Sequence, residues 1–106
     1  MDDADAVFKA LADATRRGLL DALFVADGQT VQALCRKVPE MTRFGVMKHL
    51  AQLESANLIT TRRAGRTKQH FLNPVPIQQV SDRWIGKYAR PFTHALVDLR
   101  DELHTA

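Results

Sequence analysis

A helix-forming segment at residues 42–54, followed at once by two short polar strands, constrains the fold of this chain more than any other part. Its apolar residues Val46, Leu50 and Leu53 recur at helical spacing, which predicts that they face a core. Thr42 comes just before them and is a favourable N-cap, because its hydroxyl can accept from free backbone N–H groups. The polar and cationic residues between the apolar positions are then left to face outward.

The two strands are expected at residues 59–63 and 67–72, around a turn at 64–66 that contains a glycine. A helix with cations at its exposed start, followed by a cationic hairpin, suits a reader of the DNA major groove that also carries a wing. The sequence therefore predicts a winged helix-turn-helix fold. This fold is mainly α, with five or six helices and a two-stranded antiparallel wing at 59–72.

Three shorter helices are predicted ahead of this segment, at residues 6–12, 15–24 and 31–38. The proline in 39–41 breaks the third helix before the next one begins. Two short helices joined by a tight turn, the second basic at its start, form a helix-turn-helix at 30–54.

Local signals mark the ends of these helices. Asp13 and Thr30 are the expected N-caps of the second and third helices. Gly18 lies inside the second helix, where glycine costs about 1 kcal/mol relative to alanine. We expect this glycine to mark a close crossing between two helices.

The C-terminal part reads as one long helix over residues 77–104, with a kink or split between Lys87 and Pro91. Its large apolar residues follow spacings of three and four: Ile77, Val80, Trp84, Tyr88, Phe92, Leu96, Leu99 and Leu103. This stripe packs either on its own domain or on a second copy of the chain. Because the preceding helices already complete a small core, we favour a dimer interface formed by Phe8, Trp84, Tyr88, Phe92, Leu96, Leu99 and Leu103.

A chain of 106 residues is expected to form one domain, residues 1–106. It has no apolar run near the roughly 20 residues that span a bilayer, and its acidic start does not resemble a signal peptide. Cys35 is its single cysteine, which excludes an intrachain disulfide. We therefore expect a cytoplasmic protein without a membrane partner.

Basic charge is concentrated on the predicted reading elements. The formal net charge is +3, but residues 36–70 hold eight Lys and Arg against two acids. Such a concentration is typical of a surface that binds phosphates, although a solvated basic surface is the alternative. The predicted DNA contacts are Thr42, Arg43, Phe44, Met47, Lys48 and His49 on the helix, and Arg62, Arg63, Arg66 and Lys68 on the wing.

These residues are expected to play different roles. Arg43 is the best candidate for a base contact, because its guanidinium can bind guanine O6 and N7 together. Arg66, at the tip of the hairpin, is expected to enter the minor groove. Phe44 and Met47 are unusual on a reading face. They either press on thymine methyl groups or turn into the core.

Two segments carry a family resemblance. Residues 8–16, FKALADATR, are similar to the "ALADPTR" signature of the ArsR/SmtB family of bacterial repressors, with Ala14 where proline is usual. Residues 48–59, KHLAQLESANLI, resemble the family's "HL..L..AGLV" segment, with Asn57 in the glycine position. Asparagine tolerates the left-handed helix cap nearly as well as glycine. The resemblance implies a homodimeric transcriptional repressor that leaves its operator when it senses a signal.

The resemblance also bears on metal. Metal-sensing members carry a Cys-x-Cys pair at positions that correspond to Thr30 and Gln32, and neither residue supplies a thiolate. Cys35 on an apolar helix face is expected to be a core residue. His94 and Asp98 lie one turn apart but lack the family's ligand spacing. We therefore expect no metal and no cofactor, in the subgroup without the cysteine pair.

No catalytic set of residues stands out, so we do not expect an enzyme. Two other functions stay open: a winged-helix module that binds proteins and not DNA, and a metal-responsive repressor with non-standard ligands. The expected partners are double-stranded DNA and a second copy of the chain. The sequence leaves open whether a small molecule or a protein acts as inducer.

Overall fold

A computed structural model describes residues 2–105 of the chain, except for the side chains of residues 90–95 and 105. Backbone contacts divide the chain into two compact units, Met1–Pro76 and Ile77–Ala106. The boundary coincides with the start predicted for the C-terminal helix. In the part of the chain that is described, no helix is long and apolar enough to cross a membrane. That the whole chain acts as one domain stays a prediction.

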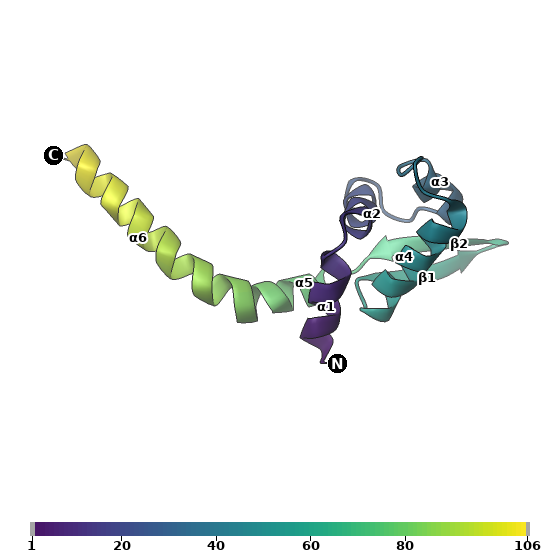
Figure 1. Ribbon diagram of the computed structural model, residues 1–106, viewed down its shortest axis with the longest axis horizontal. Helices are drawn as coiled ribbons and strands as arrows, with labels where there is room; N and C mark the ends of the chain where they lie inside the picture. Colours follow the sequence, from purple (N-terminus) through teal and green to yellow (C-terminus); the bar gives the residue numbers. More distant parts are fainter. Residues whose placement is uncertain (1, 106) are drawn as a thin grey trace. The chain divides into compact units, whose positions relative to one another are not determined.

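The first unit has the element order of a winged helix-turn-helix domain (Figure 1). Helix α4 contacts α3, α2 and β1, so that helices support one side of it and the hairpin supports its end. The predicted architecture, helical with a two-stranded antiparallel wing, is confirmed. Its elements are α1 (Asp3–Leu11), α2 (Ala14–Val25), α3 (Val31–Cys35), α4 (Arg43–Ser55), β1 (Ile59–Ala64) and β2 (Thr67–Leu72).

The apolar stripes predicted for the helices form the core of this unit. Burial of one large aliphatic side chain stabilises the folded state by about 1.5–3 kcal/mol. The stripes therefore account for a large part of what holds α2, α3 and α4 together. The buried side chains are Leu19, Leu20 and Leu23 on α2, Leu34 on α3, and Val46, Leu50 and Leu53 on α4.

Hydrogen bonds confirm the predicted helix caps. Asp13, Thr30 and Thr42 each accept a bond from the backbone N–H three residues later, at 3.0, 3.2 and 3.1 Å. Asn57 has a φ of 61°, the left-handed conformation expected where the family has glycine. Asp2 also caps a helix, because its carboxylate accepts from two N–H groups of α1. This cap explains why α1 begins three residues earlier than the sequence predicted.

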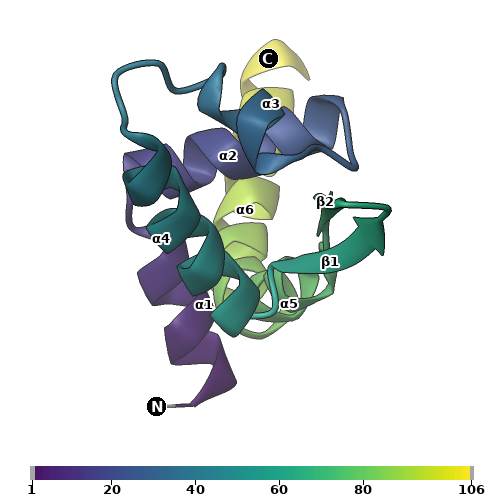
Figure 2. The same ribbon diagram turned by 90° about the vertical axis from the view of Figure 1, so that its right-hand side faces the viewer.

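The hairpin pairs in register from Ile59 opposite Leu72 to Ala64 opposite Thr67. Gly65 lies in the turn with a φ of 65°, a conformation that glycine adopts without steric cost. The closed end of the hairpin projects from the helices (Figure 2). This places the turn where a wing can reach a partner.

The loop before α3 adds a short rung to the sheet, which the sequence did not predict. The backbone N–H of His70 donates to the carbonyl oxygen of Gln29 at 2.8 Å, and that of Gly28 donates to the carbonyl of His70 at 2.9 Å. Asp27 adds a carboxylate oxygen that accepts from the Leu72 N–H at 2.8 Å. The base of the wing is thus fastened to the loop between α2 and α3.

Two expectations for the helices are wrong. A Cβ added to Gly18 meets no described atom within 4 Å, so this glycine marks no close helix crossing. Helix α3 ends at Cys35 and not near Val38, although Val38 is buried. Val38 reaches the core from the turn after the helix, because a position in the apolar pattern does not require helical backbone.

The second unit is helical, but it is not one regular helix. Helix α5 (Val75–Val80) spans the boundary, and a π-helical segment (Ser81–Ile85) leads into α6 (Gly86–Thr105). Of the kink or split expected between residues 87 and 91, the split is wrong, because α6 runs through Pro91. Proline removes a single backbone hydrogen bond, and the helix continues despite that loss. The irregular turn lies upstream, where the wider π turn shifts the phase of the apolar stripe.

Candidate nucleic-acid interface

The outward face of α4 carries the residues whose orientation the sequence left open. Phe44 and Met47 are 72% and 49% exposed, which excludes the alternative in which they turn into the core. Arg43 and Lys48 are also exposed. The Lys48 ammonium nitrogen lies 5.6 Å from the centroid of the Phe44 ring. This face therefore combines positive charge with a pair of large apolar side chains.

His49 differs from the other predicted contacts on α4, because its ring is half-buried and already has a partner. Nη1 of Arg16, on α2, lies 3.3 Å from Nδ1 of His49. A guanidinium group only donates, so Nδ1 must accept and the ring proton resides on Nε2. The Nε2–H group is then the donor of the His49 ring that remains free to bind a phosphate.

Arg16, to which the sequence assigned no role, makes hydrogen bonds through its side chain to two other helices. Its Nε donates to the carbonyl of Ala10 at 2.7 Å and its Nη2 to the carbonyl of Lys9 at 3.0 Å, both near the end of α1. Its Nη1 also donates to Oε1 of Gln52 on α4. One side chain thus fastens the end of α1 to the candidate reading helix. The sequence offered one signal for this role, because Arg16 is the last residue of the segment 8–16 that resembles the family signature.

The four predicted cations of the wing do not share one face. Opposite residues of an antiparallel pair lie on the same face, so Arg63 and Lys68 lie together. Arg62 lies on the other face, with its guanidinium carbon 5.4 Å from the centroid of the Phe71 ring. Arg66 is exposed in the turn. The wing therefore presents one pair of cations, one stacked arginine and one arginine at its tip.

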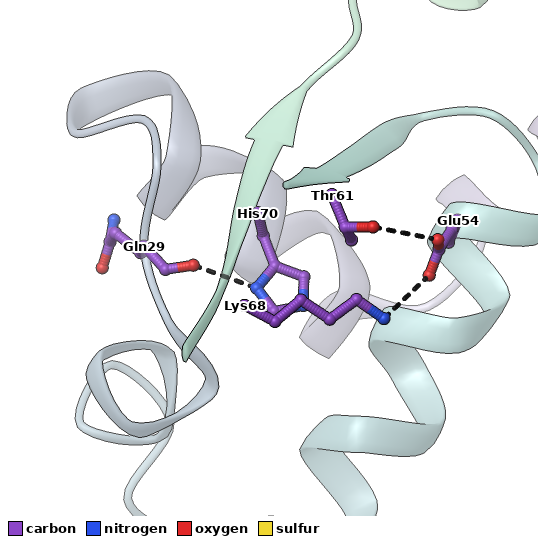
Figure 3. Close-up of polar contacts among 5 residues, drawn as sticks. All are labelled: Gln29, Glu54, Thr61, Lys68 and His70. Atoms are coloured by element: carbon purple, nitrogen blue, oxygen red, sulfur yellow. Dashed lines mark hydrogen bonds and ion pairs between the residues drawn. The ribbon is translucent and has the colours of Figure 1, made fainter. Parts of the chain in front are cut away.

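Glu54 links the end of α4 to the wing (Figure 3). Its Oε2 lies 3.9 Å from Nζ of Lys68, and its Oε1 accepts from the Thr61 hydroxyl at 3.4 Å. The side chains of this ion pair are 50% and 45% exposed, so it contributes little to stability. Within the described residues, no ion pair involves Arg43, Arg63 or Arg66.

His70 is part of the framework of the wing rather than of its surface. It is only 3% exposed, and its Nδ1 lies 2.9 Å from the carbonyl oxygen of Gln29 (Figure 3). A carbonyl oxygen only accepts, so Nδ1 carries the proton. This bond reinforces the backbone rung between β2 and the loop before α3.

Most of the described side chains predicted for a dimer interface are exposed. Phe8 is 41% exposed, and the described α6 side chains predicted for the interface are more so. Trp84 is half-buried, and the ammonium nitrogen of Lys87 lies 4.7 Å from its ring centroid. Phe92 lies outside the described side chains. The exposed fractions are 60% for Tyr88, 66% for Leu96, 53% for Leu99 and 71% for Leu103.

The positions that correspond to the family's thiolate pair have other uses. Thr30 caps α3, and Gln32 is exposed. Cys35 is a free, half-buried cysteine. Among the side chains that are described, no group of three or more His, Cys, Asp or Glu is placed to hold a metal ion. His94 lies outside those side chains.

Comparison with known proteins gives the class of the chain. A family model described as a helix-turn-helix domain matches residues 11–62. The HTH-type transcriptional regulator YuzN of Bacillus subtilis (strain 168) is 36% identical over 86 residues, which cover 76% of this chain and 94% of that protein. The crystal structure of an ArsR family transcriptional regulator is 29% identical, with a TM-score of 0.72, over 86% of this chain and 91% of the other. The chain belongs to the ArsR-type helix-turn-helix transcriptional regulators.

A further solved structure shares the fold. It is the homodimeric winged helix-turn-helix DNA-binding domain of a Mycobacterium bovis protein, 24% identical, with a TM-score of 0.62. The match covers 99% of this chain and 85% of the other. This match shows the shared fold alone. The relatives in the preceding paragraph place the chain among transcriptional regulators rather than enzymes, as the sequence predicted.

Proposed function

We propose that this ArsR-type regulator is a homodimeric repressor that binds a palindromic operator. The observation that carries the proposal is the exposed start of α4. There the Arg43 side chain, without an ion pair among the described residues, stands beside Thr42, Lys48 and the apolar pair. Such a helix start is the part of a helix-turn-helix that meets base edges.

In this proposal α4 lies in the major groove and the wing meets the neighbouring backbone. Arg43 binds a guanine edge, while Lys48 and the Nε2–H of His49 bind phosphates. On the wing, Arg63 and Lys68 bind the backbone as a pair and Arg66 reaches the minor groove. Two like charges directly opposite each other destabilise a hairpin, and a phosphate between them removes that repulsion. Arg62, stacked on Phe71, contributes long-range charge more than contact.

The homodimer is supported by the exposed apolar face of α6. Leu96, Leu99 and Leu103 recur at helical spacing with more than half of each side chain in water. An apolar stripe of this kind is typical of an interaction surface. The Mycobacterium bovis domain with the same fold is homodimeric. Two-fold symmetry of the protein then requires two half-sites in the operator.

We place this repressor in the cytoplasm, with DNA and its own second copy as partners. A signal that releases the operator is part of the proposal, and a small molecule and a protein both remain candidates for it. The alternatives are a module that binds proteins without DNA and a repressor with unusual metal ligands. The concentration of cations on α4 and the wing favours the DNA-binding reading over the first of these.

The deciding experiment compares DNA from upstream of the protein's own gene with scrambled DNA of equal length and composition. Affinities are measured over a series of salt concentrations. We expect tighter binding to the natural sequence and a linear fall of log affinity with log salt. Equal affinity for both DNAs, or none for either, would contradict the proposal.

Two variants separate base reading from backbone contact. Arg43→Ala should weaken binding to the preferred sequence by about 1–3 kcal/mol and relax the preference at one base position in each half-site. Arg66→Ala should weaken binding to all sequences about equally and reduce the salt slope by about one unit. A protein-binding module would show neither pattern.

A further inference from the structure

The two large apolar side chains on the reading face of α4 are exposed, and they form a surface that a binding partner can cover. Phe44 and Met47 are three residues apart and thus neighbours on the helix surface, while Val46 and Leu50 of the same helix are buried. The turn that carries them therefore has one face in the core and a second apolar face in water. A contiguous apolar surface on a small protein is typical of an interaction site.

The charges around this apolar pair define the kind of partner. Arg43 and Lys48 are exposed on the same turns, and the Lys48 ammonium lies over the Phe44 ring. From residue 42 to residue 53 the chain has no acidic residue, and Glu54 is the first. An occupant must therefore bring negative charge and apolar groups at close range.

The DNA major groove supplies this combination. Its walls are phosphates, and the apolar group among its base edges is the C5-methyl of thymine. We propose that Phe44 and Met47 read thymine methyl groups in the half-site, beside the guanine read by Arg43. This inference rests on the proposed DNA-binding function and adds the chemical group that sets its base preference. An acidic protein surface is the competing occupant, and the test below distinguishes it.

The test removes methyl groups from DNA without altering base pairing. A binding site is first selected by the wild-type protein from a random 30-base-pair duplex pool. The selected duplex is then synthesised with deoxyuridine in place of one thymidine at a time. At one or two thymines in each half-site, the wild-type protein should bind the uracil duplex about fourfold more weakly, the effect of burying one methyl-sized group. At the other thymines the affinity should not change.

The protein variants assign that loss to the two side chains. Phe44→Ala and Met47→Ala should each bind the thymine duplex more weakly and should lose the distinction between thymine and uracil at one position. Phe24→Ala is the matched control, because Phe24 is 80% exposed on α2 and thus belongs neither to the reading helix nor to the wing. It should keep the full wild-type distinction. Thermal melts show that each variant is folded.

The possible results are separable. If the wild-type protein binds thymine and uracil duplexes equally at every position, the methyl readout is overturned while DNA binding stands. The same conclusion follows if the two variants lose affinity but keep the distinction. If no duplex is selected from the pool, the proposed DNA-binding function fails together with this inference. An acidic protein partner for the apolar pair is then the competing assignment.

Discussion

Nη1 of Arg16 lies 3.3 Å from Nδ1 of His49, so that a residue of α2 orients a candidate DNA-contacting residue of α4. The same guanidinium donates to Gln52 one turn further along α4 and to two carbonyls at the end of α1. Three helices thus meet at one side chain. These bonds contribute to the stability of the first unit, and the bond to His49 fixes the tautomer of a ring that we propose as a phosphate donor.

Replacing Arg16 should therefore destabilise the fold more than an ordinary surface substitution does. Arg16→Ala removes the donors of two backbone carbonyls and two side chains, and we expect a loss of about 2–3 kcal/mol in the free energy of unfolding. The neighbouring Arg17 is a matched control, because it is exposed and its side chain donates one bond, to the Leu11 carbonyl at 2.8 Å. Arg17→Ala should cost less than about 1 kcal/mol. Urea unfolding of both variants measures the difference, and equal losses would contradict the role given to Arg16.

The cap of α2 predicts a dependence of stability on pH. The backbone N–H of Arg16 donates to the Asp13 carboxylate and, with the nearby positive charge of the Arg16 guanidinium, holds the pKa of that carboxyl below its ordinary value of 3.8, despite an opposing effect of desolvation. A carboxyl with a lowered pKa in the folded state stabilises the protein above its unfolded pKa. That stability is lost as the pH falls through the folded value.

Asp13→Asn tests this dependence, because asparagine keeps the cap but not the charge. The melting temperature of the wild type should exceed that of the variant by a constant amount at neutral and mildly acidic pH. The difference should shrink as the pH falls below about 4, near the ordinary pKa of an aspartate. Thermal melts between pH 7 and pH 2.5 measure it. A difference that stays constant over the whole range would exclude the charge as its origin.

The elements that the sequence predicted well are those governed by local rules. The caps at Asp13, Thr30 and Thr42 and the left-handed Asn57 depend on residues within one turn, and all four are found as expected. The apolar stripes of α2 and α4 also depend on simple periodicity. The rung between Gln29 and the wing escaped prediction, because it joins segments about 40 residues apart and its donors are mostly backbone groups.

The candidate site was predicted less completely, for similar reasons. The apolar periodicity did not decide whether Phe44 and Met47 face the core or the solvent, because an exposed phenylalanine contradicts the usual pattern. Only the packing of α4 decides their orientation. Arg62 and Arg63 lie on opposite faces of the hairpin because successive side chains of a strand alternate. This difference could be read from the sequence once the register was known. The role of Arg16 could not be read from spacing, since its partners lie on α1 and α4 and not on its own helix.

Gly18 offers a way to stabilise the protein. It lies inside α2 with open space around the position of a Cβ, so Gly18→Ala should raise the free energy of unfolding by about 0.5–1 kcal/mol through helix propensity. Gly28→Ala is the opposite case, because Gly28 has a φ of 77° and an added Cβ lies 3.1 Å from the Phe71 ring. It should destabilise. Chemical unfolding of both variants checks the signs, and a destabilised Gly18→Ala would reveal a contact at that position in the assembled protein.

The proposed dimer predicts that a lysine disrupts it at one residue of α6 and leaves it intact at the neighbouring residue. Leu99→Lys puts a charge into the apolar stripe and should convert the dimer into a monomer at micromolar concentration, since an unpaired charge is costly to bury. Asp98→Lys introduces the same side chain at a neighbouring exposed position outside that stripe and should leave the dimer intact. Sedimentation velocity distinguishes the two states. A wild-type monomer, or equal behaviour of the variants, would contradict this use of α6.

The ion pair between Glu54 and Lys68 predicts a variant that binds DNA more tightly. The carboxylate lies 3.9 Å from a cation that we assign to phosphate binding, so it competes with the phosphate. Glu54→Gln keeps an acceptor for Thr61 and frees Lys68. We expect affinity for operator DNA to rise about twofold to fivefold at low salt, and the slope of log affinity against log salt to steepen by up to about one unit.

Glu40→Gln is the control, because it removes an exposed acid of the same basic segment that lies outside α4 and the wing. Lys68→Ala should abolish most of the gain from Glu54→Gln, and a gain of the same size in both backgrounds would show that Lys68 is not the cation involved.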